Sequence, residues 1–159
     1  MPIALFLKVD GADGESVNAK HVNWTDLKSF SWGANQPSTM HEGGGGGAGK
    51  VSFSDCTAVA HVDKAYPALL IKCASGEHIS KVDVSCSKAG GEEMEYFKIT
   101  LEDVLVTNVD VSGASGAEVL VTYSFQAAKV KSDYSVQTDK GSKGATSSFG
   151  WHIKKNIKL

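Results

Sequence analysis

The sequence lacks a long hydrophobic run. Its N-terminal apolar stretch covers only Pro2 to Leu7, far short of the roughly 20 apolar residues that span a bilayer. It also lacks the basic leader and the small-residue cleavage site of a secretory signal peptide. We therefore expect a protein that is made and folded in the cytoplasm and does not insert into a membrane. Its export would need machinery that handles folded proteins.

Cysteine is scarce and the charge is nearly balanced. The three cysteines, Cys56, Cys73 and Cys86, stand at wide spacings without a C-x-x-C pair or a histidine at zinc-finger spacing. This pattern predicts buried thiols and no metal site. The formal net charge of −2 gives no drive toward nucleic acid, whose partners usually carry a basic excess. We expect no nucleic-acid partner and no cofactor.

The residues that are present describe an ordinary globular protein. The chain has 159 residues, of which 42% are apolar and 21% are charged. This length is enough for one hydrophobic core and short for two. We expect a single domain over residues 1–159.

Alternation of apolar and polar residues dominates the chain and predicts strands with one buried face. The clearest case is 81–87, where Val82, Val84 and Cys86 alternate with polar residues. The other strand candidates are 3–9, 27–32, 51–61, 94–111, 119–128 and 149–157.

One segment has helical periodicity instead. Its apolar residues recur at i, i+3, i+4 and i+7, which predicts one short helix with a single apolar stripe. Asp63 is the expected N-cap, and Gly76 can supply the left-handed residue that ends the helix. The stripe consists of Tyr66, Leu69, Leu70 and Cys73.

Glycine-rich clusters separate the strand candidates. Segments 10–15, 89–92 and 113–116 predict hairpin connections, and the polar stretch 139–148 predicts a mobile loop. Many short strands with one helix and no βαβ alternation favour a β-barrel or sandwich over an α/β enzyme fold. The sequence is therefore expected to be mainly β.

The run GGGGGAGK at 43–50 is similar to a P-loop, because Gly44, Gly49 and Lys50 match G-x-x-x-x-G-K. The next residue is Val51, where a P-loop has the serine or threonine that binds magnesium. The run also precedes an alternating segment, whereas a P-loop precedes a helix. We interpret it as an extended loop that a partner orders.

No catalytic constellation stands out. The sequence contains neither H-E-x-x-H nor a complete nucleophile elbow, since 113–117 reads GASGA. The one enzymatic alternative is a thiol, Cys56 or Cys73, paired with one of five histidines. We expect ordinary structural histidines and no catalytic residues.

Several short motifs, in order along the chain, resemble the haemolysin-coregulated protein (Hcp) family of type VI secretion systems. They include Phe30-Ser31-Trp32-Gly33, the Met40-His41-Glu42 that leads into the glycines, and Asp63-Lys64 before Pro67-Ala68-Leu69. Lys88-Ala89-Gly90-Gly91-Glu92, the run ITLEDVLV at 99–106 and Gly150-Trp151-His152-Ile153 follow. The resemblance extends over essentially the whole chain.

This resemblance implies a fold and a function. The fold is a β-barrel of two antiparallel sheets with one flanking α-helix, assembled into a homohexameric ring. The rings stack into a tube inside a contractile sheath, leave the cell beneath the spike protein VgrG, and can carry effector proteins in the lumen. The resemblance thus implies a secreted virulence component that is not an enzyme.

Two sets of residues are candidates for functional surfaces. In segment 27–32, Phe30 and Trp32 share one face and Ser29 and Ser31 the other, so a barrel core would take the aromatic rings. If the outer face lines the lumen, Ser29 and Ser31 form a small polar wall. The resemblance implies a ring-stacking loop, which consists of His41, Glu42, Gly43, Gly44, Gly45, Gly46, Gly47, Ala48, Gly49 and Lys50.

The same strand pattern also fits a monomeric β-barrel that binds a small molecule or carbohydrate, with the glycine run as a mouth loop. Oligomeric state separates this alternative from the tube subunit. Because the sequence ends at Leu159, shortly after the last expected strand, we expect no fused enzymatic extension. Which strands form the ring interface is left open.

Overall fold

The computed structural model describes residues 3–38, 49–89 and 93–159. Among these residues, no helix is long and apolar enough to cross a membrane. The elements in chain order are β1 (Ile3–Val9), β2 (Thr25–Ser31), β3 (Ala34–Asn35), β4 (Ser52–Phe53), β5 (Cys56–His61), α1 (Ala65–Ser75), β6 (Ile79–Lys88), β7 (Met94–Ser112), β8 (Leu120–Gln137), β9 (Lys143–His152) and β10 (Ile157–Lys158).

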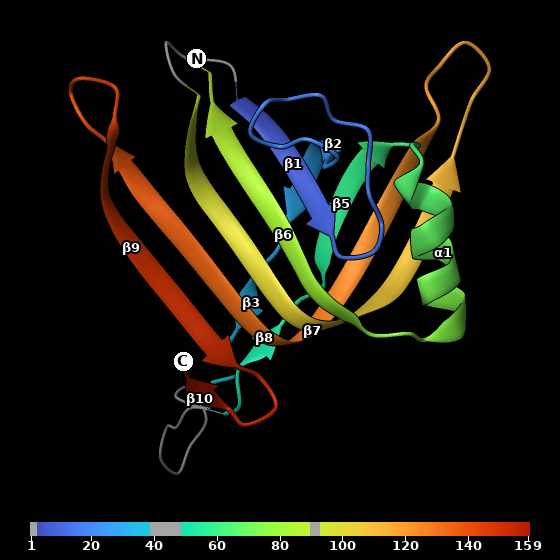
Figure 1. The fold of residues 1–159 in the computed structure, drawn as a ribbon. Coiled ribbons are helices and arrows are strands. Elements are labelled where there is room, and N and C mark those ends of the chain that lie inside the picture. The colour runs from blue at the N-terminus through green and yellow to red at the C-terminus, as the bar shows by residue number, and fades with distance from the viewer. Residues whose placement is uncertain (1–2, 39–48, 90–92) are drawn as a thin grey trace.

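Six antiparallel strands form a closed barrel in the order β8, β5, β2, β1, β6 and β7, with β7 pairing back onto β8 (Figure 1). Strands β9 and β10 extend the sheet beyond β8, and β3 with β4 forms a separate two-stranded ribbon. The expected mainly β barrel with one flanking helix is confirmed. The two expected sheets form one continuous sheet, because the long strands β7 and β8 run from one into the other.

The core fills the barrel with the inward residues of each strand. Alternate positions point to opposite faces of a strand, so β6 contributes Val82 and Val84, and β8 contributes Tyr123 and Phe125, all at most 1% exposed. The helix closes one side of this core, where Leu69 is fully buried. The helix therefore covers a part of the core that the strands leave open.

The helix forms where expected, but the predicted stripe is wrong at Leu70, which is 40% exposed; Ala65 and Leu69 are buried, and Tyr66 and Cys73 pack against the core only in part. The Ala65 backbone N–H donates to Asp63 Oδ1 at 3.0 Å, so Asp63 caps the first turn although Lys64 occupies the cap position. At the other end, Gly76 has a φ of 71° and its N–H donates to the Lys72 carbonyl oxygen. A left-handed residue there is nearly free of strain only for glycine.

Residues 10–24, the covering segment, connect β1 to β2 and lie over the outer face of β1 and β6 (Figure 1). Because of this cover, Ser85 and Ser87 of β6 are fully buried although they point away from the core. The cluster 10–15 is thus the start of a long covering connection and not a hairpin turn. The cluster 113–116 does connect a hairpin, β7 to β8, whereas in 89–92 residues 90–92 lie outside the described part.

The prediction of a mobile loop at 139–148 was wrong. Strand β8 continues past the expected end at residue 128 to Gln137, and Lys143–His152 forms β9 against it. Only a tight turn separates the two strands, closed by the Thr138 N–H donating to the Ser142 carbonyl oxygen at 2.8 Å. Pairing with β8 stabilises the first half of this strand, where residues 145–149 are exposed and no alternation marks it, whereas Trp151 near its end packs against the core.

Other strand boundaries also differ from the expected ones. Segment 149–157 contains the end of β9, a reverse turn with Asn156 at a φ of 55°, and β10, so it is not one strand. Segment 51–61 is divided into β4 and β5. Strand β2 lies two residues earlier than expected at its start, at Thr25.

Candidate functional site

The outer face of β2, β5 and β8 carries a row of small polar side chains. The strand register places Ser31 opposite Thr57 and Thr57 opposite Ser124, and the Thr57 and Ser124 hydroxyl oxygens lie 3.3 Å apart. Ser29 lies opposite Val59, which lies opposite Thr122. We call this surface the hydroxyl wall; it consists of Ser29, Ser31, Thr57, Thr122 and Ser124.

The expected division of β2 into two faces is present. Ser29 and Ser31 are exposed, whereas Phe30 and Trp32 pack against the core. Phe30 meets the ring of Phe97 edge to face at 6.1 Å between centroids. The aromatic side chains therefore anchor β2 to the core, and the two serines are exposed on its outer face.

Charged groups mark one end of the hydroxyl wall. Lys28 Nζ lies 3.1 Å from Glu118 Oε2, and His61 Nδ1 lies 3.5 Å from the same oxygen. The hydrogen bond from Lys28 lowers the pKa of the Glu118 carboxyl group, and the charge interactions with His61 and Lys28 act in the same direction. The Glu118 carboxylate at this end of the wall therefore stays ionised at neutral pH.

An acidic residue marks the other end. The carboxylate of Asp55 accepts a hydrogen bond from the Thr107 hydroxyl at 2.7 Å and one from the Gln126 amide at 2.9 Å. Sequence reasoning missed Thr57, Ser124 and Asp55 as parts of this surface. Only the strand register brings them beside Ser29 and Ser31, and no local signal specifies that register.

The second candidate surface, the glycine loop, lies mostly outside the described residues: His41 to Ala48 belong to the part that is not described. Gly49 and Lys50 lie at its base, on the ribbon of β3 and β4. The Gly49 N–H donates to the Pro37 carbonyl oxygen at 3.1 Å, and a Cβ at Gly49 would lie 2.9 Å from Pro37 Cγ. Glycine is required there because the two arms of the ribbon approach so closely.

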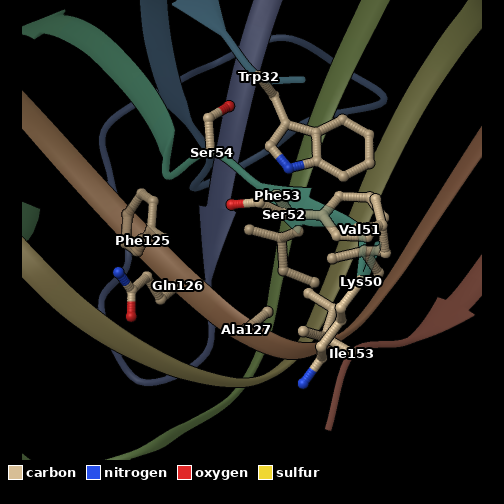
Figure 2. A pocket seen from close by; sticks show the side chains of 12 residues that line it. Trp32, Lys50, Val51, Ser52, Phe53, Ser54, Phe125, Gln126, Ala127 and Ile153 are labelled. Carbon is tan, nitrogen blue, oxygen red and sulfur yellow. The ribbon is translucent and has the colours of Figure 1, made fainter. Parts of the chain in front are cut away.

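A cavity of about 430 Å³ lies between this ribbon and β8 (Figure 2). Trp32 and Phe53, stacked at 5.8 Å between centroids, lie on one side, and Phe125 and Gln126 lie on the other. Among the described residues of the lining, Lys50 is the one that is ionisable. The cavity can accept an apolar group, and the described lining has no pair of groups for acid and base catalysis.

Cys56 gives no support to the enzymatic alternative. Cys56 and Cys86 are buried as expected, whereas Cys73 is only partly buried. Burial, followed by the charge of Asp55, raises the pKa of Cys56 to about 12, and burial with the charge of Glu95 raises that of Cys86 to about 11. Both thiols stay protonated near neutral pH, and the thiolate is the nucleophile. In the described ranges, no group of three or more histidine, cysteine, aspartate or glutamate side chains is placed to hold a metal ion.

The chain is similar to known proteins over most of its length. The family model described as "Type VI secretion system effector, Hcp" matches residues 6–134. Protein hcp1 of Pseudomonas aeruginosa is 39% identical over 162 residues, covering 99% of both chains.

Solved structures agree. The crystal structure of Hcp1 from Salmonella typhimurium is 35% identical and covers all of both chains with a TM-score of 0.84. A type VI secretion system effector from Yersinia pestis is 30% identical over 94% of this chain and 99% of its own, with a TM-score of 0.76. A further type six secretion system protein reaches a TM-score of 0.94 at 26% identity over 99% and 100% of the two chains. With the sequence, the fold and the relatives in agreement, this chain belongs to the Hcp family of type VI secretion proteins.

Proposed function

We propose that the chain is a structural subunit of the type VI inner tube. In this proposal six copies form a ring, the rings stack and are secreted, and effector proteins travel in the lumen. The hydroxyl wall faces that lumen. The partners are further copies of the chain, the contractile sheath, the spike protein VgrG and the effectors, and the subunit itself catalyses nothing.

One observation carries the ring: the sheet of the hydroxyl wall has two edges that lack a neighbouring strand over part of their length, although α1 packs against β7. Strand β1 pairs with β2 only at Thr25 to Leu27, so Lys28 to Ser31 have no strand beside them on that edge in the described structure. Strand β6 pairs with β7 only as far as Val104, which leaves 105–112 without a second strand in the same sense. Uncovered edges tend to pair with another chain.

The two edges differ, which suits a ring. A closed ring requires head-to-tail contacts between two different surfaces of each subunit. If the β2 edge of one copy pairs with the β7 edge of the next, the wall sheets of six copies join into one continuous lining. Small hydroxyl side chains would then make that lining polar and smooth, which suits cargoes of differing shape.

The glycine loop is proposed to stack one ring on the next. Its described base is a narrow ribbon held by the Gly33 N–H donating to Ser54 Oγ at 2.9 Å, and Ser54 Oγ donates back to the Gly33 carbonyl oxygen at 3.0 Å. A ribbon anchored in this way can present a loop to a second ring. Deleting residues 43–48 should weaken tubes more than rings; tubes of unchanged length would remove the reason for this role.

Engineered cysteines test the edge pairing directly. Ser29 or Ser31 of β2 and Asn108 or Asp110 of β7 are all exposed, so a small panel of double variants samples the registers between copies. We expect at least one pair to give, on mild oxidation, a covalent ladder that ends at six chains. The matched control joins the same β2 cysteine with one at exposed Lys131. A ladder from the control alone would contradict the proposed edges.

The ligand-binding alternative rests on the cavity beneath the ribbon. Its lining is mainly apolar with a few polar groups, as in many small-molecule sites. This alternative predicts a monomer at all concentrations that gains thermal stability from a hydrophobic dye. The tube proposal predicts a ring whether or not such a dye binds.

A further inference from the structure

The outward face of α1 is apolar. Its exposed positions recur at i, i+3, i+4 and i+7, away from the buried Ala65 and Leu69. A surface helix normally carries polar residues on its outward side, and a helix that is apolar all round is normally buried. In the single chain, however, Ile71 is 63% exposed. We call this surface the helix patch; it consists of Pro67, Leu70, Ile71 and Ala74.

The one charged residue of α1, Lys72, extends away from this patch. Its side chain is largely buried, and its Nζ lies 3.5 Å from Glu77 Oε2. A Cβ at Gly11 would lie 3.6 Å from Lys72 Cε, so the lysine side chain runs along the turn that follows β1. The helix patch therefore presents apolar surface to a partner and no charge of its own.

A second apolar surface lies at the far end of the β8–β9 hairpin. The register places Trp151 opposite Val130 and Phe149 opposite Ser132, and directly opposed residues share one face of a sheet. Because Val130 and Trp151 pack in the core, this face is the inner face of the barrel, continued to where the described strands no longer cover it. We call this surface the hairpin patch; it consists of Tyr134, Val136 and Phe149, which are 45% to 50% exposed.

The two patches lie on opposite sides of the subunit. In Figure 1, β9 lies at the far left and α1 at the far right, so one chain cannot bring its own two patches together. A closed head-to-tail ring requires two unlike surfaces on each subunit. The helix patch and the hairpin patch are such a pair, and each offers the other a surface of the same apolar kind.

We propose that the hairpin patch of one copy packs on the helix patch of the next copy. This contact rests on the proposed ring and adds a second layer to the boundary between subunits. The β2 and β7 edges join on the lumen side of that boundary, and the two patches cover its outer side. The occupant of each patch is thus a second copy of this chain.

Contacts within the chain place each patch beside one of the two proposed edges. On one side, α1 packs against β7, so the helix patch accompanies the β7 edge. On the other side, Phe53 stacks on Trp32, which directly follows β2, and lies 6.3 Å from Phe149 between ring centroids. A neighbour whose β7 edge meets the β2 edge therefore brings its α1 to the side of the hairpin patch.

A charge swap tests this pairing. Ile71→Glu and Tyr134→Arg each place one charge in the contact, at a position that is half or more exposed in the single chain and so affects folding little. We expect each variant to raise the concentration needed for rings by at least about tenfold, because an unpaired buried charge opposes association. The double variant brings opposite charges together between neighbours and should regain most of that loss. Native mass over a concentration series measures the rings, and the melting temperature checks the fold.

Val17→Glu is the matched control. Val17 is an exposed apolar residue of the covering segment, outside both patches, so this variant should form rings as the wild type does. Engineered cysteines give a second readout. Ala74→Cys with Ser147→Cys, which lies opposite Tyr134 on the same face, should give disulfides between copies on mild oxidation. Ala74→Cys with Ser148→Cys, the next residue and on the opposite face, should not.

The outcomes separate this contact from the ring itself. If the wild type and both single charge variants form rings equally well, the patches serve some other partner; the proposed contact is then overturned and the ring stands. Rings that are lost in both single variants and not regained in the double variant would also overturn the pairing. A wild type that stays monomeric at every concentration would contradict the proposed ring, and this contact with it.

Discussion

Two outer faces of the barrel, on β6 and on β2, carry similar serine residues, but one face is buried and the other is exposed. On β6, Ser85 and Ser87 point outward and are fully buried beneath the covering segment. On β2, Ser29 and Ser31 point outward and are exposed. Serine on the outside of a strand therefore does not by itself indicate a surface open to a partner.

The difference lies in what satisfies the polar groups. The covering segment supplies a partner to Ser85, from His21 Nε2 at 3.0 Å, whereas the buried Ser87 hydroxyl has no hydrogen-bond partner among the described residues. On the hydroxyl wall, no described segment covers Ser29 and Ser31, which are exposed, and the sheet has edges on both sides that lack a neighbouring strand over part of their length. We infer that the first face stabilises the subunit and that the second is reserved for assembly and cargo.

The largest expected effect comes from breaking the covered face. His21→Ala removes the ring stacked on Phe6 and one of the two hydrogen-bond partners of the Ser85 hydroxyl, the other being Glu95. We expect the free energy of unfolding to fall by about 2 to 4 kcal/mol, measured by urea denaturation at about pH 6. Ser31→Ala on the hydroxyl wall should change it by less than about 0.5 kcal/mol; equal losses in the two variants would contradict the comparison.

Two glycines sharpen the same contrast. A Cβ at Gly14, within the covering segment, would lie 2.6 Å from the Trp24 carbonyl oxygen, whereas at Gly33 its nearest contact is Ser54 Oγ at 3.9 Å. Gly14→Ala should therefore destabilise the protein by about 1 to 3 kcal/mol through overpacking. Gly33→Ala should be nearly neutral. Thermal denaturation of the two variants side by side checks the prediction, and a Gly14→Ala protein as stable as Gly33→Ala would refute it.

The hydroxyl wall should respond in cargo and not in stability. Ser31→Gln places a longer side chain on the exposed face, so we expect the same melting temperature and the same oligomer but less co-purified effector. Retention is measured by pull-down of the effector from the producing cells. Lys81→Gln, exposed at the β6 side of the barrel, is the control; cargo retention unchanged by Ser31→Gln would count against the wall as the lumen lining.

The smallest effect concerns the helix cap beside the covering segment. Burial raises the pKa of Asp63, while the hydrogen bonds from Ala65 and Thr25 partly offset this. Since a raised pKa means that the folded state holds the proton more tightly, its contribution is full below the ordinary value of 3.8 and is lost as pH rises through the raised value.

Asp63→Asn keeps an acceptor for the Ala65 N–H and removes the buried charge. We expect a gain of a few tenths of a kcal/mol at about pH 7, since solvent screens this half-buried group, and no gain at about pH 3. Denaturant titrations at the two pH values measure it. A gain that is equal at both would show that the charge has no part in it.

The sequence predicted those strands and the helix in which one buried face leaves a periodic pattern of apolar residues. Alternation along 3–9 and 81–87 marked strands, and the stripe from Tyr66 to Cys73 marked the helix, because in each the core selects one face. The order of short motifs indicated the family, which the relatives confirm.

Elsewhere the sequence could not predict the structure, because long-range pairing decides it. Strand β9 has exposed residues on both faces and is stabilised by its backbone pairing with β8, so its first half read as a loop. The grouping of Ser31, Thr57 and Ser124 depends on the register of three strands, and the buried His21 depends on a connection that crosses the sheet. Neither leaves a local pattern.

The native mass of the purified chain, paired with electron images, tests the central claim most directly. A tube subunit whose wall sheet has two unlike open edges should form closed particles of six chains with ring-shaped end views. A stable monomer at every concentration would contradict the account, because the uncovered edges would then have no neighbour to pair with.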